Sequence, residues 1–124
     1  MMRACPCQSG ETYDNCCGRF HRGEALAPTA ERLMRSRYSA YVLGEVAYLL
    51  KTWHPTTRPT ALELDPEVRW YRLDILSRTG GGMLDTRGTV EFRARYRSDG
   101  IADQQHENSA FVRDNGAWLY VNAV

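Results

Sequence analysis

The chain has 124 residues, of which 43% are hydrophobic and 25% charged, the composition of one ordinary folded domain. Its 16 basic and 15 acidic side chains leave a formal net charge of +1. This balance argues against a nucleic-acid-binding protein, because such binding needs clustered positive charge. The hydrophobic runs are too short for a membrane span, and the first residues lack a signal-peptide pattern. We therefore expect a soluble, cytoplasmic protein without a membrane partner.

All four cysteines lie within the first 17 residues, as Cys5, Cys7, Cys16 and Cys17. Any disulfide among them would close only a short loop, and disulfides stabilise most when they close long ones. A cytoplasmic setting also keeps thiols reduced. Four thiolates in two close pairs suit the tetrahedral coordination of zinc. The spacing predicts one structural Zn²⁺ held by all four cysteines, with a redox cluster or oxidised cysteines as the alternatives.

The segment CPCQSGETYDNCCG, residues 5–18, resembles the SEC-C motif, the zinc knuckle of the preprotein translocase ATPase. The resemblance implies that the four cysteines are the metal ligands and that the knuckle docks a protein partner, which in the translocase is an acidic chaperone. Gln8 stands where the motif usually has glycine, and Glu11 and Asp14 stand where lysines are common. These two carboxylates would repel an acidic partner. We expect a protein partner of another kind, of unknown identity.

The period of a helix begins after the connector that follows the knuckle. Thr29 is a good N-cap and Gly44 a natural stop. A second short helix is predicted over residues 46–52, and a further helical turn over 61–64. Phe20 and Leu26, in the connector, are expected to pack the knuckle against the main domain.

Three polar side chains of this helical region are candidates for function. Arg37 falls in the buried stripe beside Tyr41, where it either snorkels to water or directs its guanidinium into a cavity toward an anionic group. Arg35 is offset from the stripe and expected in solvent. His54 follows the second helix, where it is a helix-terminal cation, a satisfied polar group or a catalytic acid/base.

The second half of the chain has strand periodicity. Strands are predicted over residues 69–77, 88–98, 107–113 and 117–123. Asp99-Gly100 and Asn115-Gly116 are hairpin turns. Helices first and a meander of strands afterwards predict an α+β domain.

The hairpin turns also predict which side chains share a face. A two-residue turn at Asp99-Gly100 puts Phe92 opposite Glu107 and Tyr96 opposite Asp103. The inner face then groups these side chains: Phe92, Tyr96, Glu107, Phe111, Trp118 and Tyr120. For Glu107 three interpretations stay open: contact with water near the strand end, a buried acid/base, or an ion pair with Arg37.

The outer face of the last hairpin is apolar as well, which predicts a cover over it. Its side chains are Ala110, Val112, Leu119 and Val121. Either a second subunit, giving a homodimer, or the zinc knuckle would serve as the cover.

Several segments resemble the YchJ-like family of small bacterial proteins: LMRSRYSAYV (33–42), YLLKTWHP (48–55), VEFRARY (90–96), ENSAF (107–111) and GAWLY (116–120). The resemblance covers nearly the whole chain. It implies an N-terminal SEC-C zinc knuckle, residues 1–22, on a domain similar to nuclear transport factor two, residues 23–124. In that fold helices pack on a curved, mainly antiparallel sheet, and the resulting cone encloses a pocket.

Two functions of different class remain. The first is a zinc-binding, non-catalytic binding or adaptor module that contacts a protein partner through its knuckle. The alternative is a small-molecule-binding enzyme, isomerase-like or dehydratase-like, with Glu107 or His54 as acid/base. The predicted pocket residues are Arg37, Tyr41, Phe92, Tyr96, Glu107, Phe111, Trp118 and Tyr120. An open cavity with Glu107, Arg37 and His54 would favour the enzyme, and a filled cone with an Arg37–Glu107 ion pair would favour the adaptor.

Overall fold

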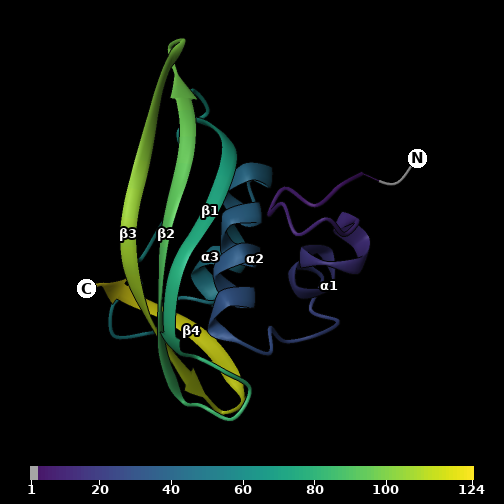
Figure 1. The fold of residues 1–124 in the computed structure, drawn as a ribbon, viewed down its shortest axis with the longest axis vertical. Coiled ribbons are helices and arrows are strands. Elements are labelled where there is room, and N and C mark those ends of the chain that lie inside the picture. The colour runs from purple at the N-terminus through teal and green to yellow at the C-terminus, as the bar shows by residue number, and fades with distance from the viewer. Residues whose placement is uncertain (1–2) are drawn as a thin grey trace.

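A computed structural model describes residues 3–124 of the chain (Figure 1). A cysteine-containing loop leads into the 3₁₀ turn η1 (Tyr13–Asn15) and the short helix α1 (Cys17–His21). The helices α2 (Ala30–Leu43) and α3 (Val46–Lys51) follow. The remaining elements are the strands β1 (Arg69–Gly80), β2 (Arg87–Ser98), β3 (Ile101–Asp114) and β4 (Ala117–Ala123). The strands form one antiparallel sheet in chain order, so the α+β prediction is confirmed.

The elements lie in three layers (Figure 1). The helices α2 and α3 lie against one face of the curved sheet, and the N-terminal loop with α1 lies on the far side of α2 from the sheet. The core lies between α2 and the sheet and includes Leu33, Met34, Tyr38, Leu49, Leu73, Val90, Phe92, Phe111 and Trp118. Phe20 joins this core with 3% of its surface exposed, so its predicted attachment is confirmed. The prediction for Leu26 is wrong, because its side chain is 60% exposed.

The caps of α2 are those that the sequence predicts. The Thr29 side chain accepts a hydrogen bond from the backbone N–H of Arg32 at 3.1 Å, and Gly44 ends the helix with a left-handed φ of 77°. The predicted helical turn over residues 61–64 is wrong. That segment has no regular secondary structure, because a four-residue stretch offers too few hydrogen bonds to nucleate a helix. Leu62 and Leu64 pack against the core.

The β2–β3 hairpin has the predicted register. Asp99 and Gly100 both have positive φ, 52° and 76°, as a two-residue turn of this type requires. Phe92 pairs with Glu107 and Tyr96 with Asp103, so the face assignment is confirmed. The third strand, however, begins at Ile101 and not at residue 107. Its first half is polar and exposed, and it is a strand because β2 pairs with it along its length.

Most of the outer face of the last hairpin lies away from the knuckle. Ala110, Val112, Leu119 and Val121 are half-buried there. The knuckle instead attaches to α2 and to the edge strand β1, through the hydrogen bonds described below. No knuckle residue that the structure describes lines the hollow at Val112 and Val121, while Phe20 lines a separate hollow with Leu119. The homodimer stays a prediction.

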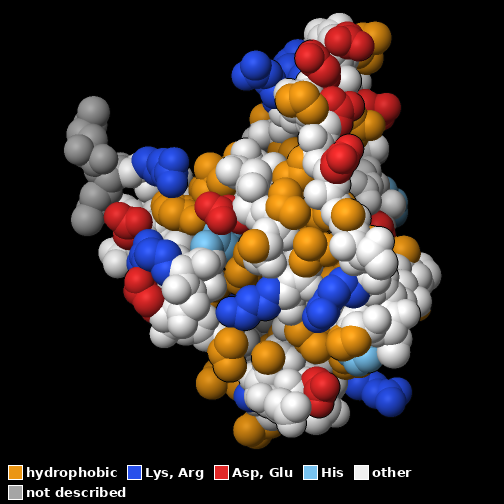
Figure 2. Space-filling view, turned by 180° about the vertical axis from the view of Figure 1, so that it is seen from behind, with side chains coloured by type: hydrophobic (Ala, Val, Ile, Leu, Met, Phe, Trp, Pro, Cys, Tyr) orange, Lys and Arg blue, Asp and Glu red, His pale blue; other side chains and the backbone are white. Residues whose placement is uncertain are grey.

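The surface and the helices add two further facts. Among residues 3–124, no helix combines the length and the hydrophobicity needed to cross a membrane. On the face shown in Figure 2, acidic, basic and hydrophobic side chains are interspersed, and both charges occur on the projecting end of the β2–β3 hairpin.

Candidate functional site

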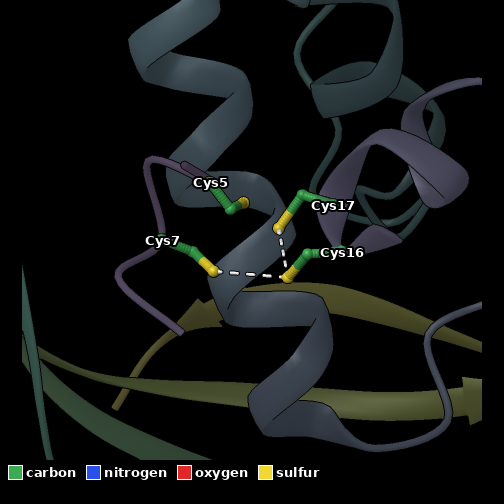
Figure 3. A group of neighbouring side chains, drawn as sticks. All are labelled: Cys5, Cys7, Cys16 and Cys17. Atoms are coloured by element: carbon green, nitrogen blue, oxygen red, sulfur yellow. Dashed lines mark hydrogen bonds between the residues drawn. The ribbon is translucent and has the colours of Figure 1, made fainter. Parts of the chain in front are cut away.

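The four cysteine sulfurs converge in front of α2 (Figure 3). All four Sγ atoms lie within 4.8 Å of one another, with Cys7 and Cys16 3.6 Å apart and Cys16 and Cys17 3.9 Å apart. A tetrahedron of sulfurs about 2.3 Å from a central zinc has edges of about 3.8 Å. All four are free thiols and each is at most 4% exposed. The arrangement therefore fits a closed, four-coordinate metal site.

Short-range main-chain hydrogen bonds bring the two cysteine pairs together. The N–H of Cys5 donates to the carbonyl of Glu11 at 2.9 Å, and Ala4 forms a β-bridge with Thr12. The N–H of Gln8 donates to the carbonyl of Cys5 at 3.1 Å and closes a tight turn that contains the first pair. These contacts fold the loop back so that Cys16 and Cys17 face the first pair.

Two serine hydroxyls contact the sulfurs. Ser39 of α2 lies 3.5 Å from Sγ of Cys5, and Ser9 lies 3.2 Å from Sγ of Cys16. The thiols also share protons: hydrogen bonds from Cys17 and Cys7 lower the pKa of Cys5, and hydrogen bonds with Cys5 and Cys7 raise the pKa of Cys17. Four adjacent thiolates are therefore unfavourable without a cation, and a bound dication would offset their negative charge.

The knuckle is held on the domain by side chains at three places. Arg35 of α2 donates from Nη1 to the carbonyl of Cys7 at 2.8 Å, so the prediction that it lies in solvent is wrong. Gln8 reaches the edge of β1, donating to the carbonyl of Tyr71 at 3.0 Å and accepting from the N–H of Leu73 at 3.3 Å. His21 donates from Nε2 to the carbonyl of Ser36 at 2.8 Å. The sequence did not predict these contacts of Arg35, Gln8 and His21. For Gln8 the one signal was that it stands where the SEC-C motif usually has glycine.

A cavity of about 260 Å³ lies between α2 and the helix-covered face of the sheet. Of the predicted pocket residues, Arg37, Tyr41, Phe92, Glu107 and Tyr120 line it, together with Met34, Tyr38, Trp53, Trp70, Ala94, Gln105 and Ser109. Three others lie elsewhere. Tyr96 packs on Trp70, while Phe111 and Trp118 are buried in the core.

Arg37 is buried, with 4% of its surface exposed, so the snorkelling interpretation is wrong. Its Nη1 donates to the carbonyl of Leu49 and to the hydroxyl of Thr52, both at 2.7 Å. The guanidinium carbon lies 5.0 Å from the ring centroid of Trp53 and 4.8 Å from that of Tyr120. Burial lowers the pKa of Arg37.

Glu107 has its own set of partners. It accepts hydrogen bonds from Ser109, from Tyr120 at 3.1 Å and from Gln105 at 3.2 Å. Within residues 3–124, no carboxylate lies within 4.0 Å of Arg37, so the ion pair considered for these two residues does not form. His54 bonds to Thr56 and does not line the cavity. The structure thus matches neither predicted arrangement in full: the cavity is open, but it lacks His54.

An antiparallel sheet wrapped on helices, with an internal pocket and a four-cysteine knuckle against α2, defines a class: an NTF2-like domain that carries a SEC-C knuckle. Residues 29–123 match the family model described as "YchJ, middle NTF2-like domain", and residues 4–19 match the SEC-C motif. The chain belongs to the YchJ family.

Relatives and solved structures agree with this assignment. The UPF0225 protein of Streptomyces coelicolor is 55% identical over 95% of this chain and 92% of its own length. That of Corynebacterium glutamicum is 54% identical over 97% and 95%. The solution structure of a SEC-C motif containing protein from Rhodopseudomonas palustris has a TM-score of 0.83 at 34% identity, covering 100% of this chain and 98% of that one. A crystal structure of a SEC-C motif containing protein from Psychrobacter arcticus has a TM-score of 0.78 at 29% identity, covering 95% and 80%.

Proposed function

We propose that the chain binds one structural Zn²⁺ through Cys5, Cys7, Cys16 and Cys17 and acts as a non-catalytic adaptor in the bacterial cytoplasm, with the knuckle contacting a protein partner. The supporting observation is the set of four buried sulfurs, all within 4.8 Å of one another. Four protein ligands would leave zinc no open position for a substrate, which is typical of structural sites.

The outward surface of the knuckle suits a partner with charges of both signs. Arg22 bonds to Asp14 at 3.2 Å and to Glu24 at 2.6 Å, and all three side chains are exposed. This surface is held to the domain through Gln8 and Arg35, so docking a partner would cost little ordering entropy.

Charge reversal on this surface tests the adaptor function. Tagged full-length protein and its Asp14→Lys variant are crosslinked in lysate of the source bacterium, and the captured proteins are identified by mass spectrometry. Asp103→Lys, on the exposed and distant β2–β3 hairpin, is the matched control. We expect a protein that the wild type and Asp103→Lys capture and that Asp14→Lys loses. The same captured set for all three chains would contradict the proposal.

The open cavity favours a second candidate function, a small-molecule enzyme with Glu107 as acid/base. Glu107 lines the cavity and lies among Phe92, Ser109 and Tyr120. His54, outside the cavity wall, is the weaker candidate for that role. To test this candidate function, the protein is mixed in heavy water with a panel of small acids that contain a carbonyl group, and exchange of their protons for deuterium is followed by NMR. Proton exchange catalysed by the wild type and lost in Glu107→Gln would support it, and no exchange above background would contradict it.

A further inference from the structure

The cavity holds a buried cation that no carboxylate of residues 3–124 contacts. Arg37 keeps its positive charge under all ordinary conditions, because a guanidinium is not deprotonated in proteins. Its hydrogen-bond partners, Leu49 carbonyl and Thr52 hydroxyl, are neutral. No ion pair is made by Arg37 within the described part of the chain. Its charge is compensated by the π faces of Trp53 and Tyr120 and, at longer range, by the Glu107 carboxylate across the cavity. A buried charge with so little compensation favours an anion nearby.

Hydrogen-bond donors are also in excess on this wall. Both hydrogen bonds of the Arg37 guanidinium come from Nη1, so Nε and Nη2 donate to no acceptor among residues 3–124. The indole N–H of Trp53, whose ring Arg37 covers, is buried and likewise has no partner there. A buried donor without an acceptor is unfavourable, and an acceptor supplied by a ligand in the cavity would satisfy these donors.

The carboxylate of the cavity is already satisfied. Glu107 accepts from Gln105, Ser109 and Tyr120, which occupy both of its oxygens. A cationic ligand would have to compete with these three donors, whereas an anionic ligand at Arg37 would displace no protein partner. The asymmetry between Arg37 and Glu107 therefore selects an anion.

The remaining walls specify the body of the ligand. The aromatic side chains of Tyr41, Trp70 and Phe92 line the cavity, next to the apolar Met34 and Ala94. The volume of about 260 Å³ is just below the usual range for drug-sized ligands, about 300–1,000 Å³. A compact, planar, largely apolar body fits this space better than a sugar or a peptide.

We propose that the cavity binds a small organic carboxylate with a planar apolar body, and that its carboxylate accepts hydrogen bonds from Arg37. The single negative charge lies at the Arg37 end, because Glu107 repels an anion placed close to it. This binding site is independent of the zinc knuckle and of the adaptor function. It shares its cavity with the second candidate function but requires no turnover.

Benzoate is the probe, with benzamide as its neutral isostere and benzylamine as its cationic counterpart. Each is titrated into ¹⁵N-labelled full-length, zinc-loaded protein, and the indole N–H signals of Trp53 and Trp70 are followed by NMR. We expect saturable benzoate binding with a dissociation constant of about 1 mM or tighter. Benzamide should bind at least tenfold more weakly. Equal binding of benzoate and benzamide, or no benzoate binding at tens of millimolar, would overturn the proposal.

Two variants separate the charge roles. Glu107→Gln removes the opposing charge and should strengthen benzoate binding about three- to tenfold. Arg37→Gln should weaken it at least tenfold, and the comparison of benzoate with benzamide in the wild type stands even if this variant does not fold. Preferential binding of benzylamine that Glu107→Gln abolishes would show a cation site and reject the inference. Benzoate binding without proton exchange would reject the enzyme and leave the inference intact.

Discussion

The side-chain oxygen of Gln8 accepts a hydrogen bond from the backbone N–H of Leu73, 3.3 Å away on the edge strand β1. With its amide nitrogen on the carbonyl of Tyr71, Gln8 pairs with β1 much as a short strand would. Its φ of 64° is left-handed, the conformation that glycine adopts without strain. Gln8 therefore accepts backbone strain at a position suited to glycine and gains two hydrogen bonds that join the knuckle to the sheet.

Two substitutions at this position separate strain from hydrogen bonding. Gln8→Ala loses the amide and keeps the strain, whereas Gln8→Gly loses both. We expect Gln8→Ala to be less stable than Gln8→Gly by roughly 1 kcal/mol, the cost of a left-handed non-glycine residue. Denaturant unfolding measures the difference. In both variants the Leu73 amide should exchange faster with solvent, and unchanged exchange would contradict the proposed role of Gln8.

Removal of zinc is expected to unfold the knuckle and leave the sheet folded. The four cysteines form a cluster separate from the main core, which has its own helices and strands. Hydrogen exchange after chelation should show loss of protection in residues 4–21 and retained protection in β2 and β3. Cys7→Ser should reproduce this pattern without chelator, while Ser77→Ala, an exposed serine of β1, serves as control. Global unfolding on chelation would show that the domain depends on the metal.

The apolar outer face of the last hairpin predicts a homodimer. Val112 and Val121 line a shallow hollow there, and a lysine at either position would be desolvated in an interface. Sedimentation equilibrium should show a wild-type dimer that Val121→Lys dissociates. Gln104→Lys adds the same charge to the exposed part of β3 and should leave the dimer intact. A wild type that remains monomeric at high concentration would reject this prediction.

Two buried tyrosines predict loss of stability at alkaline pH. Burial raises the pKa of Tyr38 and that of Tyr48 to about 12 each, from an ordinary value of about 10. A folded-state pKa above the unfolded one gives stability that is complete below pH 10 and is lost as the pH rises toward 12. Each tyrosine should contribute about 1.4 kcal/mol per pH unit to this loss.

Phenylalanine variants test this linkage. Tyr48→Phe loses the hydrogen bond to Ser36, which should lower the free energy of unfolding at neutral pH by about 1 kcal/mol. Above pH 10, however, the free energy of unfolding should fall less steeply with pH, because one tyrosine no longer titrates. Tyr38→Phe should flatten the slope equally. Free energies of unfolding at pH 9, 10 and 11 measure both. A slope that neither substitution changes would mean that other groups cause the alkaline loss.

Part of the structure could be predicted from sequence because it depends on local chemistry. The cysteine cluster was predicted from the spacing of the four cysteines, and the ends of α2 from the capping preferences of Thr29 and Gly44. The pairing of Phe92 with Glu107 followed from a two-residue turn. Each of these depends on residues close in sequence or on strict alternation along a strand.

The missed features depend on tertiary position. Nothing in the local sequence indicates that Arg35 reaches the carbonyl of Cys7, which is 28 residues away. The separation of Arg37 from Glu107 likewise depends on how α2 packs on the sheet. The polar first half of β3 was missed because its strand conformation comes from pairing with β2 and not from its own hydrophobic pattern.

The metal content of the protein tests the central claim, that the four cysteines bind one zinc, most directly. Protein purified without chelator is weighed by native mass spectrometry and again after denaturation in acid, and its thiols are titrated in both states. The account predicts one zinc per chain in the native state, lost in acid, and four thiols that react only after the metal is released. Native protein without metal and with four freely reactive thiols would contradict it.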